Sequence, residues 1–176
     1  MTKQELEMCI YEYGKDIYSF CKHLTCSLQE ADDLYQNTFL TAVELKDKID
    51  YADNVKSYLL SIALRIWKNR KRKFAWRKRI ADIRPMTEEK DTGISISTKL
   101  LPEEQILNEE KKEAVRHAVD KLPKRLCVVI LLFYMEELPI AQIASILKIP
   151  AGTVKSRLHK ARKLLKKELE DVLDEK

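Results

Sequence analysis

The sequence predicts an all-α fold with two small helical domains joined by a flexible linker, the second domain containing a helix-turn-helix. Apolar residues recur at helical spacing in both halves of the 176-residue chain, and neither half shows a convincing strand alternation. Between the halves, residues 84–101 contain Pro85, Gly93 and scattered serines and threonines without a helical period. Charged residues make up 35% of the chain and aromatic residues 7%, which suits small, charge-covered helical domains better than one large core.

The first predicted domain, residues 1–83, contains three helices. The apolar pattern places them at about 3–25, 28–46 and 54–80, with a loop before the third helix. The apolar residues that define the helices are Ile10, Ile17, Phe20, Cys21, Leu34, Phe39, Val43, Val55, Tyr58, Leu59, Ile62 and Ile66.

The second predicted domain, residues 102–176, is divided by prolines into four helices. Proline is tolerated at a helix start because its missing N–H would have no partner there. The prolines Pro102, Pro123, Pro139 and Pro150 place the helices at about 102–120, 123–136, 139–147 and 151–172.

Basic residues gather in two stretches that contain no acidic residue. Residues 65–79 hold nine Lys or Arg and residues 151–167 hold seven. Residues 1–64, by contrast, hold six basic and eleven acidic residues, a net charge of 6 − 11 = −5. Two such stretches favour contact with a polyanion such as DNA. For either stretch alone, a solvated helix face is the alternative.

The cysteines and the hydropathy pattern indicate a reduced, cytoplasmic protein. The sequence has no CxxC pair, and Cys127 is expected to be a small buried hydrophobe. Cys21 and Cys26 lie beside His23 but lack a fourth ligand, so no metal site is expected. The N-terminus is polar, and the longest apolar run, residues 126–135, is shorter than the about 20 residues that a membrane helix needs.

The strongest pattern is a helix-turn-helix that begins near Leu138. A short helix, the turn Lys148-Ile149-Pro150 and a longer helix are predicted. Such a pair can place its second helix in the major groove of DNA, which is about 12 Å wide. The predicted inner faces are Ile140, Ile143, Ala144 and Leu147 in the first helix, and Val154, Leu158, Ala161 and Leu165 in the second.

The outer face of the longer helix is predicted to contact DNA. Residues near its start are expected at base edges, and later ones at phosphates, which position the protein but do not specify sequence. The first group is Lys155, Ser156, His159 and Lys160; Arg157 is also counted on this face; and the phosphate group is Arg162, Lys163, Lys166 and Lys167.

The segment LPKRLCVVILLFYMEELPIAQIASILKIPAGTVKSRLHKARKLL resembles region four of extracytoplasmic-function (ECF) sigma factors of bacterial RNA polymerase. The resemblance implies that this domain reads the minus-thirty-five promoter element and that its preceding helices pack on the flap of the polymerase beta subunit. Lys148 stands where the family usually has glycine, and Pro139 stands where a Ser or Thr cap is common. Regulators of the LuxR type carry a similar TVKSRL helix, so this segment alone does not distinguish a sigma factor from such a regulator. The sequence of the first domain is needed for that distinction.

The segment EADDLYQNTFLTAVE is similar to the region-two helix of the same family. Asp32, Asp33 and Gln36 fall within about one helical turn and share a face. The resemblance implies that this face, with Asn37, docks on a coiled coil of the polymerase beta-prime subunit; the family prefers Glu at position 37. Acids that balance the helix macrodipole are the alternative interpretation.

The helix NVKSYLLSIALRIWKNRKRKFAWRKR resembles the part of region two that captures the melted minus-ten element. Basic residues follow the backbone of single-stranded DNA, and Trp67, Phe74 and Trp76 are rings on which bases can stack; ordinary packing is the alternative for either tryptophan. The loop before the helix is implied to hold an extruded base, with Tyr51 and Asn54 as candidates. The predicted minus-ten residues are Tyr51, Asn54, Lys56, Tyr58, Arg65, Trp67, Lys68, Arg70, Lys71 and Arg72.

No enzymatic function or cofactor is expected. The sequence has no Walker loop and no GxGxxG, HExxH or GxSxG motif. Adjacent Asp32 and Asp33 point about 100° apart on a helix, a poor geometry for a two-metal site. The alternatives are a free-standing helix-turn-helix regulator, an adaptor that binds polymerase without choosing promoters, and a nuclease-like enzyme. The two region-two motifs favour a sigma factor, with core polymerase, promoter DNA and an anti-sigma factor, often membrane-anchored, as the implied partners.

Overall fold

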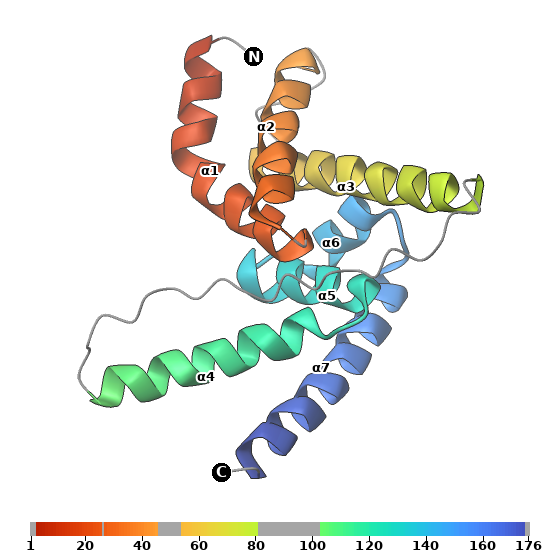
Figure 1. The fold of residues 1–176 in the computed structure, drawn as a ribbon. Coiled ribbons are helices and arrows are strands. Elements are labelled where there is room, and N and C mark those ends of the chain that lie inside the picture. Colours follow the sequence, from red (N-terminus) through yellow and green to blue (C-terminus); the bar gives the residue numbers. More distant parts are fainter. Residues whose placement is uncertain (1–2, 26, 46–53, 81–102, 175–176) are drawn as a thin grey trace. The chain divides into compact units, whose positions relative to one another are not determined.

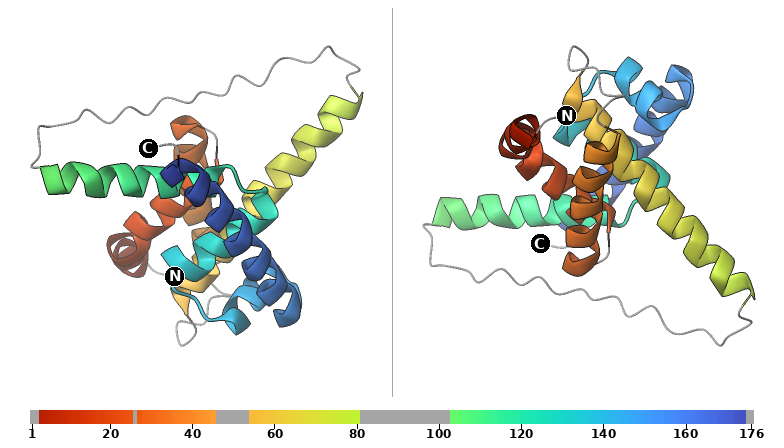
Figure 2. Two further views of the ribbon diagram at one scale, coloured as in Figure 1. Left: turned by 90° about the horizontal axis from the view of Figure 1, so that it is seen from below. Right: turned by 90° about the horizontal axis from the view of Figure 1, so that it is seen from above.

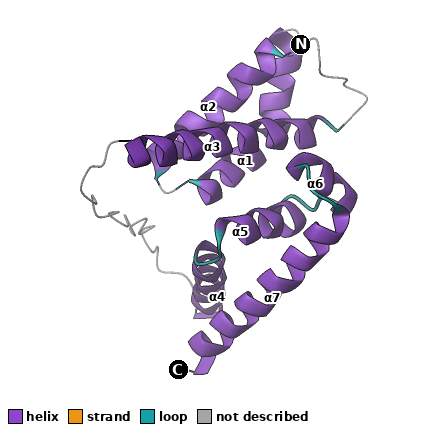
Figure 3. Cartoon of the chain, turned by 90° about the vertical axis from the view of Figure 1, so that its right-hand side faces the viewer, coloured by secondary structure: helices purple, strands orange, loops and turns teal. Residues whose placement is uncertain are grey.

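Every regular element in the part of the chain that the structure describes is a helix (Figure 3). The computed structural model describes residues 3–25, 27–45, 54–80 and 103–174. The chain divides into two compact units, unit 1 (Met1–Asp91) and unit 2 (Thr92–Lys176). The predicted all-α fold class is confirmed. The predicted linker and its limits lie outside the described residues.

Unit 1 contains α1 (Lys3–Leu24), α2 (Leu28–Glu44) and α3 (Val55–Ile80). The first two helices run side by side in opposite directions, and α3 crosses and contacts both (Figure 1). The core side chains with no or almost no exposed surface are Ile17, Phe20, Leu24, Leu34, Leu59, Leu60 and Leu64.

Two of the apolar residues that define the helices of unit 1 are exposed. Ile10 and Val43 share the helical period of the core residues but remain open to solvent. A helical period predicts which face is apolar, whereas burial also requires a second helix above that part of the face. Leu60 and Ala63 are not among the apolar residues of that pattern, yet both are fully buried.

Polar caps define where two helices of unit 1 begin. The Ser27 hydroxyl accepts a hydrogen bond from the Glu30 amide at 3.2 Å and caps α2. The Asn54 side-chain oxygen accepts one from the Ser57 amide at 3.0 Å and caps α3. Each cap gives a partner to a backbone donor that has none within the helix.

Unit 2 contains α4 (Glu103–Asp120), α5 (Lys124–Ile130), the π-helical turn η2 (Leu131–Met135), α6 (Ile140–Leu147) and α7 (Ala151–Asp174). The long helix α7 contacts α4, α5 and α6 (Figure 2). One helix was predicted over 123–136, where the structure has α5 followed by η2. The core of the unit consists of buried side chains that include Leu126, Cys127, Val129, Leu132, Ile143, Val154, Leu158 and Ala161.

Lys148 ends α6 in a left-handed conformation, with φ 54° and ψ 49°. The Ile149 amide donates to the Ala144 carbonyl at 3.1 Å, and the Lys148 amide donates to the Ser145 carbonyl at 3.2 Å. These two bonds form a Schellman motif, in which the left-handed residue is usually glycine. The turn of the helix-turn-helix therefore requires Lys148 to adopt a conformation that is unfavourable for a residue with a Cβ atom.

None of the helices among the described residues has the length and apolar character to cross a membrane.

Candidate nucleic-acid interface

The helix-turn-helix of unit 2 presents the outer face of α7 to solvent. Val154, Leu158 and Ala161 are buried on the inner face. Of the predicted DNA-contacting residues, Arg157 is half-buried at one edge. The others are exposed: Lys155, Ser156, His159, Lys160, Arg162 and Lys163. The structure therefore brings the predicted reading residues together on the first turns after Pro150.

Two residues on this face are already engaged by protein groups. The Lys166 ammonium lies 3.5 Å from the Glu170 carboxylate one turn later, which partly offsets its charge. The Arg162 Nε donates to the Tyr134 hydroxyl at 2.8 Å. Its guanidinium carbon also lies 5.5 Å from the Phe133 ring centre and 5.6 Å from the Tyr134 ring centre. The sequence predicted a phosphate contact for Arg162 and gave no sign of its aromatic neighbours.

The predicted docking residues of unit 1 form an exposed surface on α2. Asp32, Asp33, Gln36 and Asn37 are all exposed. The Asn37 amide donates to the Asp33 carbonyl at 2.5 Å, so the residue that departs from the family pattern bonds to its own helix. The Tyr18 hydroxyl of α1 donates to the Asp32 carboxylate at 2.8 Å and holds that side chain toward α1.

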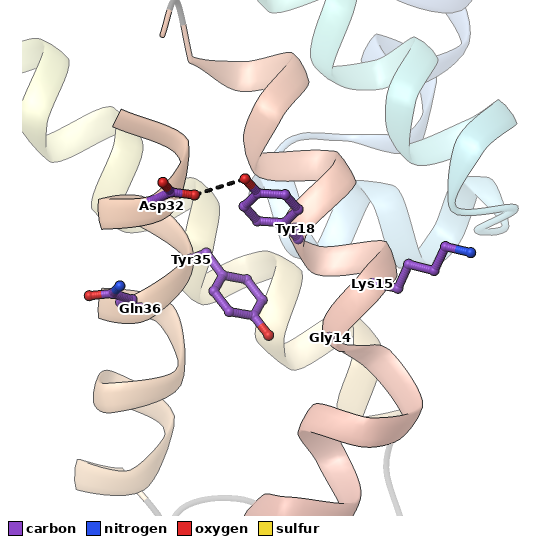
Figure 4. Close-up of a pocket in the computed structure, with 6 residues that line it drawn as sticks. All are labelled: Gly14, Lys15, Tyr18, Asp32, Tyr35 and Gln36. Atoms are coloured by element: carbon purple, nitrogen blue, oxygen red, sulfur yellow. Dashed lines mark hydrogen bonds between the residues drawn. The ribbon is translucent and has the colours of Figure 1, made fainter. Parts of the chain in front are cut away.

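An open pocket of about 430 Å³ lies between α1 and α2 beside these residues (Figure 4). Its aromatic wall is well packed: the Tyr35 ring meets Tyr18 edge to face at 5.5 Å and Phe39 at 5.0 Å. The hydrogen bond to Asp32 raises the pKa of Tyr18, and burial raises the pKa of Tyr35. The pocket is lined by Gly14, Lys15, Tyr18, Asp32, Tyr35 and Gln36.

Gly14 is required by the close approach of Tyr35. A Cβ atom at position 14 would lie 2.9 Å from the Tyr35 hydroxyl oxygen, closer than side chains normally approach. The sequence gave no indication of this contact, because a glycine inside a helix identifies no partner.

The basic end of α3 is exposed and carries two exposed rings. Phe74 is 67% exposed and Trp76 is 61% exposed, so both rings are open to a ligand. Trp67, by contrast, is half-buried, and its indole N–H is buried without a hydrogen-bond acceptor in the described part of the chain. The basic residues of this end that were predicted to contact DNA are exposed: Arg65, Lys68, Arg70, Lys71 and Arg72.

Several predicted minus-ten residues also have contacts within unit 1. Asn54 caps α3, and the Lys56 ammonium forms an ion pair with Asp16 of α1 at 2.8 Å. Tyr58 is half-buried. The Arg70 guanidinium donates to the Asp33 carbonyl at 3.4 Å and links α3 to the docking helix. Tyr51 lies outside the described residues.

The cysteines that the structure describes are buried. Cys9, Cys21 and Cys127 lie inside their units, as was predicted for Cys127. Burial raises the pKa of Cys21 to about 12 and raises that of Cys127. No group of three or more His, Cys, Asp or Glu side chains in the described ranges is arranged to hold a metal ion. Cys26 lies outside those ranges.

Comparison with known proteins defines the class of the chain. Residues 9–77 match the family described as Sigma-70 region 2, and residues 112–165 match the family described as Sigma-70, region 4. Both matches fall on the helices that carry the surfaces described above. The protein is therefore a sigma-70-type transcription initiation factor.

Individual relatives identify the family within that class. The ECF RNA polymerase sigma factor SigW of Bacillus subtilis (strain 168) is 30% identical over 164 residues, covering 91% of this chain and 86% of SigW. The RNA polymerase sigma factor YlaC of the same organism is 26% identical, covering 95% of this chain and 93% of YlaC. The chain belongs to the ECF sigma factors, which bind core RNA polymerase and direct promoter recognition, DNA melting and transcription initiation.

Two solved structures have the same fold. The sigma factor RpoE from Bartonella quintana, in complex with the anti-sigma factor NepR, matches with a TM-score of 0.73 and 22% identity over 96% of both chains. CnrH, in complex with the cytosolic domain of CnrY, matches with a TM-score of 0.66 and 16% identity, covering 97% of this chain and 90% of CnrH.

Proposed function

We propose that the two units of this sigma factor contact different parts of the promoter. Unit 2 reads the minus-thirty-five element as duplex DNA through α7. Unit 1 docks on the beta-prime coiled coil through α2 and captures the melted minus-ten strand through α3. The observation that carries the proposal is the outer face of α7, where six predicted DNA-contacting residues are exposed on a stretch without an acidic residue.

Duplex reading is assigned to the start of α7. Recognition helices reach base edges with their N-terminal residues. Lys155 and Lys160 are long enough to donate to guanine acceptors in the major groove, and Ser156 can accept from a base donor. The bond from the Ser156 hydroxyl to the Thr153 carbonyl, at 3.0 Å, leaves its oxygen lone pairs available as acceptors.

Strand capture is assigned to the far end of α3. Phe74 and Trp76 are exposed among basic residues, which is the combination that binds single-stranded DNA. Because the Trp67 ring is half-buried, we assign base stacking to Phe74 and Trp76 rather than to Trp67. Promoter melting then gains the stacking free energy of each captured base.

Docking is assigned to the exposed surface of α2. Asp33 and Gln36 offer a carboxylate and an amide to a basic helical partner, and Asp32 is oriented by Tyr18. The helices of unit 2 that precede the helix-turn-helix are assigned to the flap of the beta subunit. These assignments involve binding only; no residue is assigned a role in bond chemistry.

An anti-sigma factor is proposed as a regulatory partner in the cytoplasm. RpoE was solved in complex with the anti-sigma factor NepR, and CnrH was solved in complex with the cytosolic domain of CnrY. We propose that this chain is controlled in the same way and that a membrane-anchored partner can hold it near the membrane.

Run-off transcription with bacterial core polymerase on a random promoter library tests the proposal. Protein-dependent transcripts that share two spaced upstream elements are expected. Lys155→Ala should change the preferred upstream element, with a cost of about 1–3 kcal/mol at the affected base pair. Unchanged promoter choice in this variant would refute the assignment of α7. Tight duplex binding without polymerase, and no transcripts, would instead indicate a free-standing regulator.

A further inference from the structure

We propose that Phe133 and Tyr134 form a clamp on Arg162 that fixes the rotation of α7 about its axis. The clamp thereby decides which side chains of α7 face the DNA bases. The inference rests on the proposed role of α7 in reading duplex DNA, and it adds to that role two residues that lie outside the helix.

The clamp consists of three contacts between one guanidinium and one short segment. Nε of Arg162 donates to the Tyr134 hydroxyl at 2.8 Å. The guanidinium carbon lies 5.5 and 5.6 Å from the centres of the Phe133 and Tyr134 rings, within the about 6 Å range of cation–π attraction. The two rings meet edge to face at 5.0 Å. Both belong to η2, the π-helical turn between α5 and α6.

Arg162 stands at the border between the buried and the exposed sides of α7. Ala161 precedes it and Leu158 lies one turn earlier, and both are buried. Arg162 is also nearly in line with Lys155, because seven residues make almost two helical turns. A rotation of α7 that turned Lys155 away from a base would therefore pull Arg162 off both rings.

The buried stripe of α7 sets which side of the helix faces the core, but it does so without directional contacts. Val154, Leu158 and Ala161 make apolar contacts, which are not directional. The Arg162–Tyr134 hydrogen bond depends steeply on distance and angle, so it adds the directional constraint that apolar packing lacks.

The clamp and a phosphate contact predict different behaviour for Arg162. A phosphate contact depends on the positive charge, which lysine would preserve. The clamp depends on the planar guanidinium and on an uncharged hydroxyl on another element. Tyr134→Phe keeps the ring and every charge and removes only the hydroxyl, so it separates the two roles.

The test uses reconstituted holoenzyme and a promoter library randomised in the upstream element, transcribed at several salt concentrations. Tyr134→Phe, Arg162→Lys and their double variant are compared with Lys155→Ala and Lys166→Ala. We expect Tyr134→Phe to reduce discrimination between the best and mismatched upstream elements by about three- to tenfold. Arg162→Lys should give a similar loss, and the double variant should be no worse than either single variant. The salt dependence of Tyr134→Phe should match that of the unsubstituted protein.

Several results would overturn the clamp. One is unchanged discrimination in Tyr134→Phe together with full activity of Arg162→Lys. In that case a further variant, Arg162→Ala, should lower the logarithmic salt slope by about one, as the loss of a phosphate contact would. Another is a uniform loss of transcription from all promoters in Tyr134→Phe together with a lower unfolding temperature, which would mean that the Tyr134 hydroxyl has a purely structural role. If Lys155→Ala alters promoter preference while Tyr134→Phe does not, the clamp proposal is refuted and the proposed role of α7 in reading duplex DNA is supported. If Lys155→Ala has no effect, the proposed function of α7 fails.

Discussion

Replacing Lys148 by glycine is expected to stabilise unit 2. Lys148 is exposed and has φ 54° and ψ 49°, a conformation in which an L-residue places its Cβ close to the following carbonyl oxygen. The two Schellman bonds are made by backbone groups, so glycine would retain both of them.

The size of the effect follows from two opposing terms. The left-handed conformation costs a residue with a Cβ about 1–2 kcal/mol. Glycine lowers the stability by about 0.4–1 kcal/mol through the greater freedom of the unfolded chain. The difference predicts a gain of about 0.5–1 kcal/mol for Lys148→Gly, or about 2–6 °C in the unfolding temperature of a unit of this size.

Thermal and urea unfolding of the full chain measure this gain in the transition that belongs to unit 2. Lys148→Ala removes the same charge but keeps a Cβ, so it should give no gain. Lys163→Gly places the same substitution inside α7 and should cost about 1 kcal/mol. A gain in Lys148→Ala equal to that in Lys148→Gly would mean that charge, not backbone strain, limits the stability. No gain in Lys148→Gly would refute the strain argument.

Three further predictions concern unit 1. Gly14→Ala should lower the unfolding temperature in the natural background and raise it in a Tyr35→Phe background, because the hydroxyl that would lie 2.9 Å from the new Cβ is then absent. A change of unfolding temperature with the same sign in both backgrounds would contradict the contact. Phe74→Ala and Trp76→Ala should each weaken open-complex formation by about 1–3 kcal/mol, measured by base reactivity in the melted region, with unchanged affinity for core polymerase. Trp67→Phe is the control. It should be nearly neutral, because the Trp67 indole N–H has no acceptor in the described part of the chain. The free energy of unfolding should fall above about pH 8.5, where the Cys21 thiol ionises in the unfolded chain, and should continue to fall toward the folded pKa of Cys21, about 12. The reason is that a pKa raised by folding contributes stability below the unfolded pKa, and this stability is lost as the pH rises. An equally steep fall in Cys21→Ala would show that another group is responsible.

The fold could be predicted because its signals are local. Amphipathic periodicity and prolines placed the helices within one or two residues of their observed limits, apart from the division of 123–136 into α5 and η2. The turn Lys148-Ile149-Pro150 was visible in the sequence because a tight turn is a short-range feature. Burial was less predictable: Ile10 and Val43 have the right period but are exposed.

The contacts that shape the sites could not be predicted, because they join residues far apart in the chain. Arg162 and Tyr134 are 28 positions apart, and Tyr18 and Asp32 are 14 apart. Neither residue of such a pair identifies its partner, since the pairing depends on how two helices cross and on side-chain rotamers. The π-helical turn η2 was missed for a related reason, because its apolar residues fit an α-helical period equally well.

Charge pattern alone does not reveal that basic residues of this protein also make contacts within their own unit. The two acid-free stretches predict contact with a polyanion, and within them Arg70 also donates to a backbone carbonyl of α2 and Arg162 lies against two rings. Lys56, which was also predicted to contact DNA, is paired with Asp16. Each of these residues fastens a helix that carries functional side chains: α3 to α1 and α2 in unit 1, and α7 to η2 in unit 2. Basic residues in this sigma factor therefore hold helices in position, a role that is separable from the DNA contacts that we propose, and only the proposed DNA contacts require the charge to face solvent.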